Sequence, residues 1–372
     1  MKNNTTIAFS CIICSLMIII SCTDNKRNEL ISNLQMDNYN IDMPKSTELS
    51  IVDSVKYIML DEKCLFSSIS KIVKVNDKIV IFDKYGSEKI LVFDVNGNYI
   101  NSIGRKGRAE NEYVKPWDIA IKGNHVLIYD RGTQRMITYD MDGNYVKSQK
   151  SAHIIEGFAP LKDGNFLAAM AKEDNSIEIC ILSKTLDLVK ELKMFDKACF
   201  DDKITDNLFQ ITDSTILYNR PIDYTVYEFN NFGEPIKKYN FDFWKNNASK
   251  EITYSYEKFV DGNGKKKYTY MYDCPLKIGN SFVCSLISKG IKCGLFYNPQ
   301  KRNSIINEWK PQFTHTELFL PIYAEKNLVY GWMDDSMIEL ISDKEKMPIE
   351  VINHLQKHGK VISIYHLNRN SI

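Results

Sequence analysis

Six side chains carry groups that could bind a ligand or a metal ion together: Trp117, His153, Glu156, Asp206, Asp273 and His315. Each precedes or begins a segment that we expect to be the innermost strand of a small sheet. In a closed ring of such sheets, all six would lie around one mouth of the central channel. Imidazoles and carboxylates that converge in this way can bind a metal or transfer protons. The competing interpretation is that they are solvated loop residues that happen to start strands.

Motifs for other chemistry are absent or incomplete. His354 and His358 lie four residues apart in HLQKH, which lacks the glutamate of a zinc protease helix. We expect these two, together with His125 and His366, to be structural. The sequence has no GxSxG and no Walker loop. We therefore assign no catalytic residue, no metal site and no cofactor.

The elements that would position these side chains repeat along the chain. The stretch KIVIFDKYGSEKILVFDVNGNYINSIG, from Lys78, closely resembles HVLIYDRGTQRMITYDMDGNYVKSQ, from His125. Asp83 and Asp130 occupy equivalent places, 47 residues apart. Short strands in a repeat of this length are typical of propeller blades. We expect both aspartates to hydrogen-bond turn amides as framework residues.

The strand pattern predicts six blades. Five units are readable, and they span residues 69–103, 116–149, 155–192, 206–243 and 273–309. A sixth unit can form from residues 316–341 and 361–366, together with the strand-like residues 50–60. The predicted fold is an all-β, six-bladed β-propeller closed by strands from both termini, which leaves no sheet edge exposed.

Two segments interrupt the pattern. Residues 244–272 form a Tyr-rich insertion, which we interpret as an extended hairpin, with a helix as an alternative for its first half. Residues 348–358 predict a helix, because Ile349, Ile352 and Leu355 recur every three residues. Gly359 is placed to end that helix.

The cysteines do not form a metal-binding pattern. None of the six that follow Cys22 belongs to a CxxC motif. Cys284 and Cys293 flank a predicted hairpin turn at Ser288 and Lys289, which would place them opposite each other. A disulfide and two buried free thiols are both compatible with this pattern.

The N-terminus reads as a targeting segment. Lys2 precedes an apolar run from Ile7 to Ile20, and Ile19-Ile20-Ser21-Cys22 resembles a bacterial lipobox. That resemblance implies a signal peptide over residues 1–21, lipid on Cys22, and a polar, flexible tether over residues 22–45 before the propeller at 46–372. An uncleaved anchor and an ordinary signal peptide are the alternatives.

Composition argues against nucleic acid as a partner. The chain has 48 Lys and Arg against 47 Asp and Glu, and removal of Lys2 with the signal would leave the two equal. Nucleic-acid-binding domains normally carry an excess of basic side chains. The excess here is aromatic instead, with 21 Tyr and 18 Phe, which suits pleated strands.

Residues 104–143 resemble an NHL repeat, with Pro116 opening a strand, Tyr129-Asp130 ending one and Arg135 before the next. Over residues 46–367 the chain looks like the six-bladed propeller lipoproteins of Bacteroidetes. The resemblance implies an envelope location in a Gram-negative bacterium. We expect a binding module that offers one mouth of the ring and the Tyr-rich insertion to an unknown protein or glycan, since aromatic side chains supply rigid contact area. Some NHL-type propellers are lyases or hydrolases that use a metal at the channel mouth, which is the alternative function for this chain.

Overall fold

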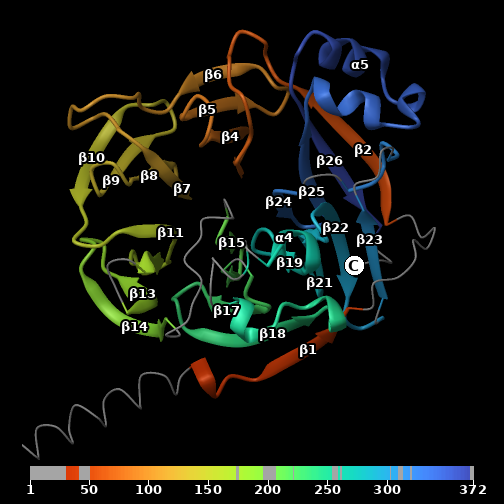
Figure 1. Ribbon diagram of the computed structural model, residues 1–372. Helices are drawn as coiled ribbons and strands as arrows, with labels where there is room; N and C mark the ends of the chain where they lie inside the picture. The colour runs from red at the N-terminus through yellow and green to blue at the C-terminus, as the bar shows by residue number, and fades with distance from the viewer. Residues whose placement is uncertain are drawn as a thin grey trace, which may run out of the picture.

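The computed structural model of this chain describes residues 31–41, 51–172, 176–195, 207–220, 222–253, 259, 262–301, 303–308, 313–318 and 321–368. Their strands form six sheets arranged in a ring, seen from one end in Figure 1. The predicted six-bladed β-propeller is confirmed. We number the blades 1 to 6 in the order in which their innermost strands follow in the chain.

Blades 1 to 3 are four-stranded antiparallel sheets. Their strands are β3 (Lys71–Val75), β4 (Lys78–Asp83), β5 (Lys89–Asp94) and β6 (Tyr99–Ser102) in blade 1; β7 (Pro116–Lys122), β8 (His125–Asp130), β9 (Arg135–Asp140) and β10 (Tyr145–Lys150) in blade 2; and β11 (Ile155–Pro160), β12 (Phe166–Met170), β13 (Ile177–Leu182) and β14 (Leu188–Met194) in blade 3. The equivalent residues Asp83 and Asp130 end β4 and β8. Asp83 accepts a hydrogen bond from the backbone amide of Ser67 (2.8 Å), and Asp130 accepts one from Lys115 (2.6 Å). Their framework role is confirmed.

Blades 4 and 5 each carry one additional strand. The strands are β15 (Phe209–Ile211), β16 (Thr215–Tyr218), β17 (Thr225–Asn230), β18 (Pro235–Asp242) and β1 (Met36–Asn40) in blade 4; β19 (Thr269–Met271), β20 (Leu276–Ile278), β21 (Ser281–Ser288), β22 (Ile291–Asn298) and β23 (Asn303–Glu308) in blade 5; and β24 (Tyr323–Glu325), β25 (Leu328–Met333), β26 (Val361–Leu367) and β2 (Val52–Met59) in blade 6.

Blade 6 closes the ring with strands from both ends of the chain. The N-terminal strand β2 pairs antiparallel with the C-terminal strand β26, from Val52 opposite Leu367 to Met59 opposite Val361. Figure 1 shows β2 beside β26 although they lie at opposite ends of the colour scale. The predicted closure is confirmed, and it pairs an edge of β26 that would otherwise be free to aggregate.

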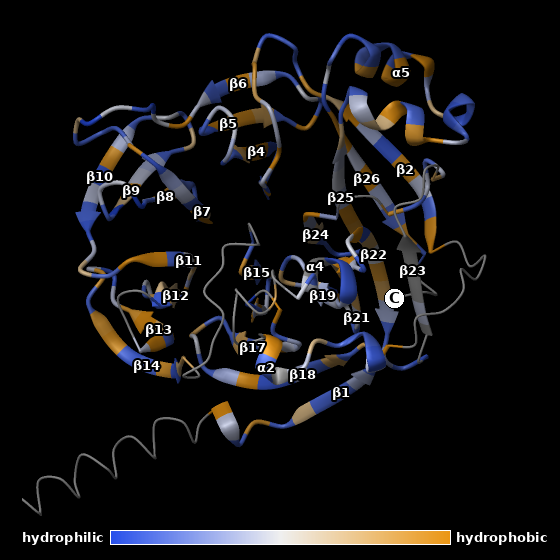
Figure 2. Cartoon of the chain, viewed as in Figure 1, coloured by the Kyte–Doolittle hydropathy of each residue, from blue (hydrophilic) through white to orange (hydrophobic). Residues whose placement is uncertain are grey.

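The hydrophobic core lies between the blades. A separate cluster of buried apolar side chains fills each of the six interfaces between neighbouring blades. In blade 3, β13 is buried over its whole length, and it is correspondingly hydrophobic in Figure 2. Each buried Val, Leu or Ile contributes roughly 1.5–3 kcal/mol. Since no blade covers its own two faces, this stability depends on the closed ring.

Residues 31–41 differ from the predicted tether. They contain β1, which adds to the outer edge of blade 4 in parallel with β18. Tyr39 is buried against Tyr239, Phe241 and Tyr297, and Ile41 is fully buried. The polar composition of the segment hid this strand, because only alternate side chains reach the core. Residues 1–30 and 42–50, with Cys22 among them, lie outside the described residues.

The Tyr-rich insertion is not an extended hairpin in the part that the structure describes. It contains short helical turns followed by β19, the added strand of blade 5. Tyr268 and Tyr270 are buried with Phe259 and Ile222 in a small core of their own. Their alternation reflects strand β19 and this packing. Tyr254 and Tyr256 lie outside the described residues.

The hairpin of β21 and β22 turns one residue later than predicted. Lys289 and Gly290, both with positive φ, form the turn, and Ser288 lies opposite Ile291. Cys284 therefore faces Leu295, and Cys293 faces Leu286. Both cysteines are buried free thiols. The shift follows from Gly290, since glycine adopts positive φ without a steric penalty.

Helical segments are short and lie in connections. They are η2 (Trp244–Asn246), α2 (Lys250–Thr253), α4 (Gly264–Lys267), η3 (Asp335–Leu340), η4 (Lys344–Lys346) and α5 (Ile349–Gln356). The predicted helix is confirmed as α5, but it buries Val351 and Leu355, whereas Ile349 is 66% exposed. Among the described residues, no helix has the length and apolar character needed to cross a membrane.

Candidate functional site

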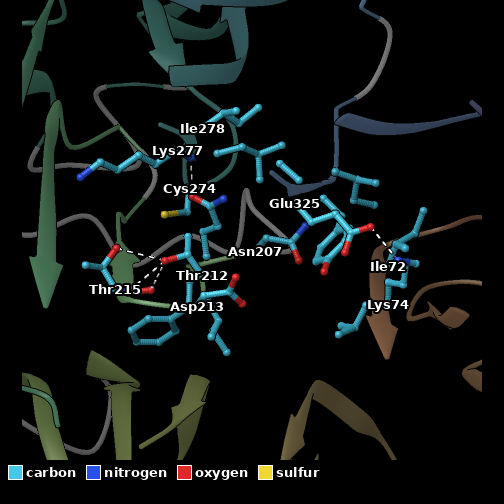
Figure 3. A pocket seen from close by; sticks show the side chains of 18 of the residues that line it. Ile72, Lys74, Asn207, Thr212, Asp213, Thr215, Cys274, Lys277, Ile278 and Glu325 are labelled. Atoms are coloured by element: carbon cyan, nitrogen blue, oxygen red, sulfur yellow. Dashed lines mark hydrogen bonds and ion pairs between the residues drawn. The ribbon is translucent and has the colours of Figure 1, made fainter. Parts of the chain in front are cut away.

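The central channel holds a cavity of about 650 Å³. Its wall comes from the innermost strands of five blades, β3, β7, β15, β20 and β24, and from the turns that follow three of them. Figure 3 shows polar side chains from several of these strands pointing into it. The volume is within the range of small-molecule sites, roughly 300–1,000 Å³.

The charges that the described residues bring to the channel wall balance. Among them, four lysines and four carboxylates line it: Lys71, Lys74, Lys277, Lys326, Asp213, Glu228, Asp273 and Glu325. Two ion pairs join neighbouring blades, Lys74 with Glu325 (2.8 Å) and Lys277 with Glu228 (2.6 Å). Lys71 pairs with Asp118 of blade 2 at 2.7 Å. The wall therefore offers polarity without a net charge.

Hydrogen bonds keep Glu325 ionised. Burial alone would raise the pKa of this carboxyl, but the hydrogen bonds from Lys74 and Tyr330 (2.8 and 2.7 Å) outweigh it and leave the pKa below its usual range. A charged Glu325 fixes the position of Lys74. Both side chains therefore hold a defined place in the channel wall.

Gln210, a residue of the cavity wall, has a buried hydrogen-bond donor that no described residue uses. Its Oε1 accepts from the backbone amide of Lys277 at 2.6 Å, which ties blade 4 to blade 5. Its side chain lines the cavity and only 6% of the residue is exposed, yet Nε2 has no partner among the described residues. A buried donor without an acceptor costs roughly 1–3 kcal/mol. A ligand that brings an acceptor oxygen would remove this cost.

Asn207 reaches across the channel. Its Nδ2 donates to the backbone carbonyl of Ser70 at 3.1 Å, and its backbone amide donates to Asp273 at 3.1 Å. Ser70 precedes blade 1 and Asn207 precedes blade 4, which are opposite each other in the ring. Asn207 therefore joins opposite blades next to the cavity, and Figure 3 shows it among the side chains that line the cavity.

Of the predicted site residues, Trp117 and Glu156 lie together. The indole N–H of Trp117 donates to Glu156 at 2.9 Å, and Arg131 pairs with the same carboxylate at 2.6 Å. Arg131 and Lys84 also lie over the Trp117 ring, at 4.6 and 4.0 Å from its centroid. The polar groups of Trp117, Arg131 and Glu156 are therefore hydrogen-bonded or ion-paired with one another at the interface of blades 2 and 3. Neither Trp117 nor Glu156 lines the channel cavity.

The other predicted residues that the structure describes have different partners. Asp273 lines the cavity and is bonded to Asn207, whereas the carbonyl of His153 accepts from Tyr129 at 3.1 Å. His315 contacts Asp343 instead, with 2.8 Å between Nδ1 and Oδ2, and this imidazole helps hold the pKa of Asp343 below its usual range against the effect of burial. Asp206 lies outside the described residues.

No metal centre emerges from these positions. In the part of the chain that the structure describes, no three His, Cys, Asp or Glu side chains are placed to hold one metal ion. The predicted ligands instead contact other side chains. His315 contacts Asp343, and Glu156 contacts Trp117 and Arg131. The described residues therefore do not supply the ligand set that the lyase or hydrolase alternative requires.

Of the described residues that line the cavity, sequence reasoning identified Asp273 and missed the others. Gln210, Asn207 and Lys277 belong to no sequence motif. Each forms a hydrogen bond with a residue of another blade, and the sequence does not show which blades come together. One signal was present in the sequence: Gln210 is a polar residue between Phe209 and Ile211 in an innermost strand. A polar side chain at such a position is expected to have a partner or a function.

Comparison with solved structures gives the same fold. The chain is similar to an exported protein from Bacteroides fragilis NCTC 9343, with a TM-score of 0.72 and 14% identity over 90% of this chain and 100% of that one. It is also similar to a member of the duf4221 family from Bacteroides vulgatus ATCC 8482, with a TM-score of 0.54 and 10% identity over 86% and 98% of the two chains. Such low identities show the fold alone.

Sequence comparison identifies the family. No curated protein matches this chain. One family model, described as a domain of unknown function (DUF4934), matches residues 33–362. This range runs from just before β1 into β26 and so includes strands of all six blades. The chain therefore belongs to the DUF4934 family.

Proposed function

We propose that this protein is an exported binding protein whose central channel takes a small, uncharged glycan. The side-chain amide of Gln210 carries the proposal, because this residue lines a cavity of about 650 Å³ and its buried Nε2 has no partner among the described residues. Sugar hydroxyls accept and donate hydrogen bonds, so they can pair with an amide, a carboxylate or an ammonium group alike.

The balanced charge of the wall supports an uncharged ligand. Lys74 and Lys277 already pair with carboxylates, so a charged ligand would have to break these pairs. A hydroxyl-rich ligand can instead add hydrogen bonds to the existing groups. Tyr323, half-buried in the wall, supplies an aromatic ring next to them. Rings of this kind provide rigid contact area for an apolar sugar face.

The envelope location is part of the proposal. The lipobox-like residues Ile19 to Cys22 and the similarity to an exported Bacteroides protein support export and lipid attachment at Cys22. A propeller held at the envelope by lipid would sample glycans from outside the cytoplasm.

A comparison of two buried, unpaired polar groups tests the channel. Gln210 lines the cavity, whereas Ser281, whose hydroxyl is also buried without a partner, does not. Neutral mono- and disaccharides would be titrated into the wild type, Gln210→Leu and Ser281→Ala by calorimetry. We expect a bound saccharide to lose roughly tenfold or more in affinity in Gln210→Leu and to bind Ser281→Ala as it binds the wild type.

Two results would count against the proposal. One is that no neutral saccharide in the panel binds the wild type. The other is that Gln210→Leu, folded as judged by circular dichroism, binds with unchanged affinity. Binding of nucleotides or other multiply charged ligands in place of saccharides would contradict the inference drawn from the balanced wall.

A further inference from the structure

A second cavity, separate from the channel, lies between blades 2 and 3. It has a volume of about 330 Å³ and opens between the outer strands β9 and β10 on one side and the β13–β14 turn on the other, at the left of Figure 1. Its floor is apolar: Leu127, Met136, Phe166 and Leu186 are all buried there. We call this cavity the 2–3 groove.

Cationic side chains surround the 2–3 groove. Lys122 comes from β7, Lys147 from β10 and Lys184 from the β13–β14 turn. The imidazole of His125 also lines the groove. No carboxylate of the described residues lines the groove. Lys147 and Lys184 are exposed and have no ion-pair partner among the described residues. Asp163 and Asp140 are close enough to act on Lys122 and His125, but they lie outside the lining.

Lys122 lies in an environment that disfavours its positive charge. Burial lowers the pKa of its ammonium group, and the charge of Lys147 lowers it further, against the opposing effect of Asp163. Its Nζ donates to the carbonyl of Gly164 at 3.0 Å, which fixes it at the rim. A bound anion would offset the repulsion between Lys122 and Lys147.

Thr138 places a hydroxyl in the floor. The residue is buried and lines the groove, and its side chain has no hydrogen-bond partner among the described residues. In the sheet, Thr138 lies opposite Lys147, so the hydroxyl and the ammonium group rise from adjacent strands on one face. The hydroxyl of Thr138 and the ammonium group of Lys147 can therefore both bind the same carboxylate.

Blade 3 differs from blades 1 and 2 at the turn beside the groove. In blades 1 and 2 the turn before the outer strand has Gly97 and Gly143, where an added Cβ would come within 2.0 and 2.7 Å of a backbone oxygen of the preceding blade. Blade 3 has Leu186 at this place, with the same backbone hydrogen bond and a φ of 63°. A leucine in this conformation is strained. Its buried side chain packs in the core between blades 2 and 3 and lines the groove.

We infer that the 2–3 groove binds a long-chain fatty-acid anion, with its alkyl chain on the apolar floor and its carboxylate between Lys147, Lys184 and Thr138. The combination of an apolar floor with a cationic rim selects an amphiphile with one anionic end. A small anion would leave the floor exposed to water, and a neutral alkyl chain would leave the lysines without a counter-charge. The inference does not depend on the proposed function of the channel.

Titration with monomeric dodecanoate tests the inference. We expect one dodecanoate to bind per chain. Dodecanol, which lacks the carboxylate, and succinate, which lacks the long alkyl chain, should each bind at least tenfold more weakly. The double variant Lys147→Glu/Lys184→Glu should lose roughly tenfold or more in affinity. Lys190→Glu, an exposed charge reversal on β14 outside the groove, is the matched control and should bind as the wild type does.

A second variant separates the floor from the rim. Val146 is 47% exposed at the edge of the groove, so Val146→Trp can cover the floor without a change in the core. It should also weaken dodecanoate binding. The inference fails if the wild type does not bind dodecanoate, if neither variant weakens binding, or if succinate or dodecanol binds equally well. It also fails if only vesicles of phosphatidylglycerol bind, because the occupant would then be a lipid surface.

Discussion

The side-chain amide of Asn207 donates to the backbone carbonyl of Ser70 across the ring, at 3.1 Å, and so links blade 4 to the opposite blade 1. Both residues are buried. A hydrogen bond between opposite blades restrains the width of the channel at this end. It also gives the segment before blade 4 a fixed position next to the cavity.

Replacement of Asn207 should therefore lower the stability of the ring. In Asn207→Ala the Ser70 carbonyl loses its donor, which we expect to reduce the free energy of unfolding by about 1–3 kcal/mol. Asn124→Ala, at the exposed turn between β7 and β8, is the control and should change it little. Urea unfolding followed by tryptophan fluorescence measures both, and equal midpoints would show that the link has no energetic role.

Two glycines with positive φ should respond differently to alanine. Gly97 (φ 91°) would place a Cβ 2.0 Å from the Met59 carbonyl oxygen, whereas Gly123 (φ 58°) would have nothing within 4 Å. We expect Gly123→Ala to cost about 1–2 kcal/mol from backbone conformation alone. Gly97→Ala must also displace β2 from blade 1, so it should be clearly more destabilising in the same urea assay. Similar losses in the two variants would contradict the close approach of blade 6 to blade 1.

Asp83 should make stability depend on acid pH. Burial would raise the pKa of this carboxyl, but hydrogen bonds from Ser87, Ser67 and Gly86 outweigh it, so the pKa in the folded state is lowered. A lowered pKa means that the ionised carboxylate stabilises the fold above its unfolded pKa, near 4, and that this contribution is lost as the pH falls below that value.

We therefore expect Asp83→Asn to be destabilised at pH 7 and to lose less stability than the wild type between about pH 5 and pH 2. Unfolding in urea at several pH values gives both slopes. Asp187→Asn, in an exposed turn, serves as the comparison and should follow the wild type. Parallel curves for Asp83→Asn and the wild type would argue against this role for the carboxylate.

Replacement of Cys22 tests the lipid anchor. If the residue receives diacylglycerol, Cys22→Ala should abolish labelling with radioactive palmitate in cells and release the protein from the membrane fraction or retain its signal peptide. Cys64→Ala, which changes a cysteine of the propeller, should leave labelling intact. Palmitate incorporation that persists in Cys22→Ala would refute lipidation at this position.

Much of the fold could be predicted from the sequence, because the information is local and repeated. The matching stretches that contain Asp83 and Asp130 define a strand–turn unit, and alternation of apolar residues indicates which segments are strands. Each unit has apolar faces that it cannot cover alone, so stacking into a ring follows. The strand-like residues near both ends then predict the closure that β2 and β26 form.

The local sequence pattern did not predict the strand register correctly where a single residue sets the position of the turn. The two cysteines of the β21–β22 hairpin are out of register because Gly290 moves the turn by one residue. The polar segment before blade 1 hid β1, because Tyr39 is the single buried residue of this strand and one position forms no recognisable pattern.

Only the tertiary structure decided where the ligand-binding groups meet. Gln210 and Lys277 are 67 residues apart and Asn207 and Ser70 are 137 apart, and each pair belongs to different blades. Such contacts depend on how each blade is rotated and spaced against its neighbour, which follows from packing over the whole ring. The chain sequence by itself thus determined the ring and its closure, while the arrangement of blades determined the channel wall and the 2–3 groove.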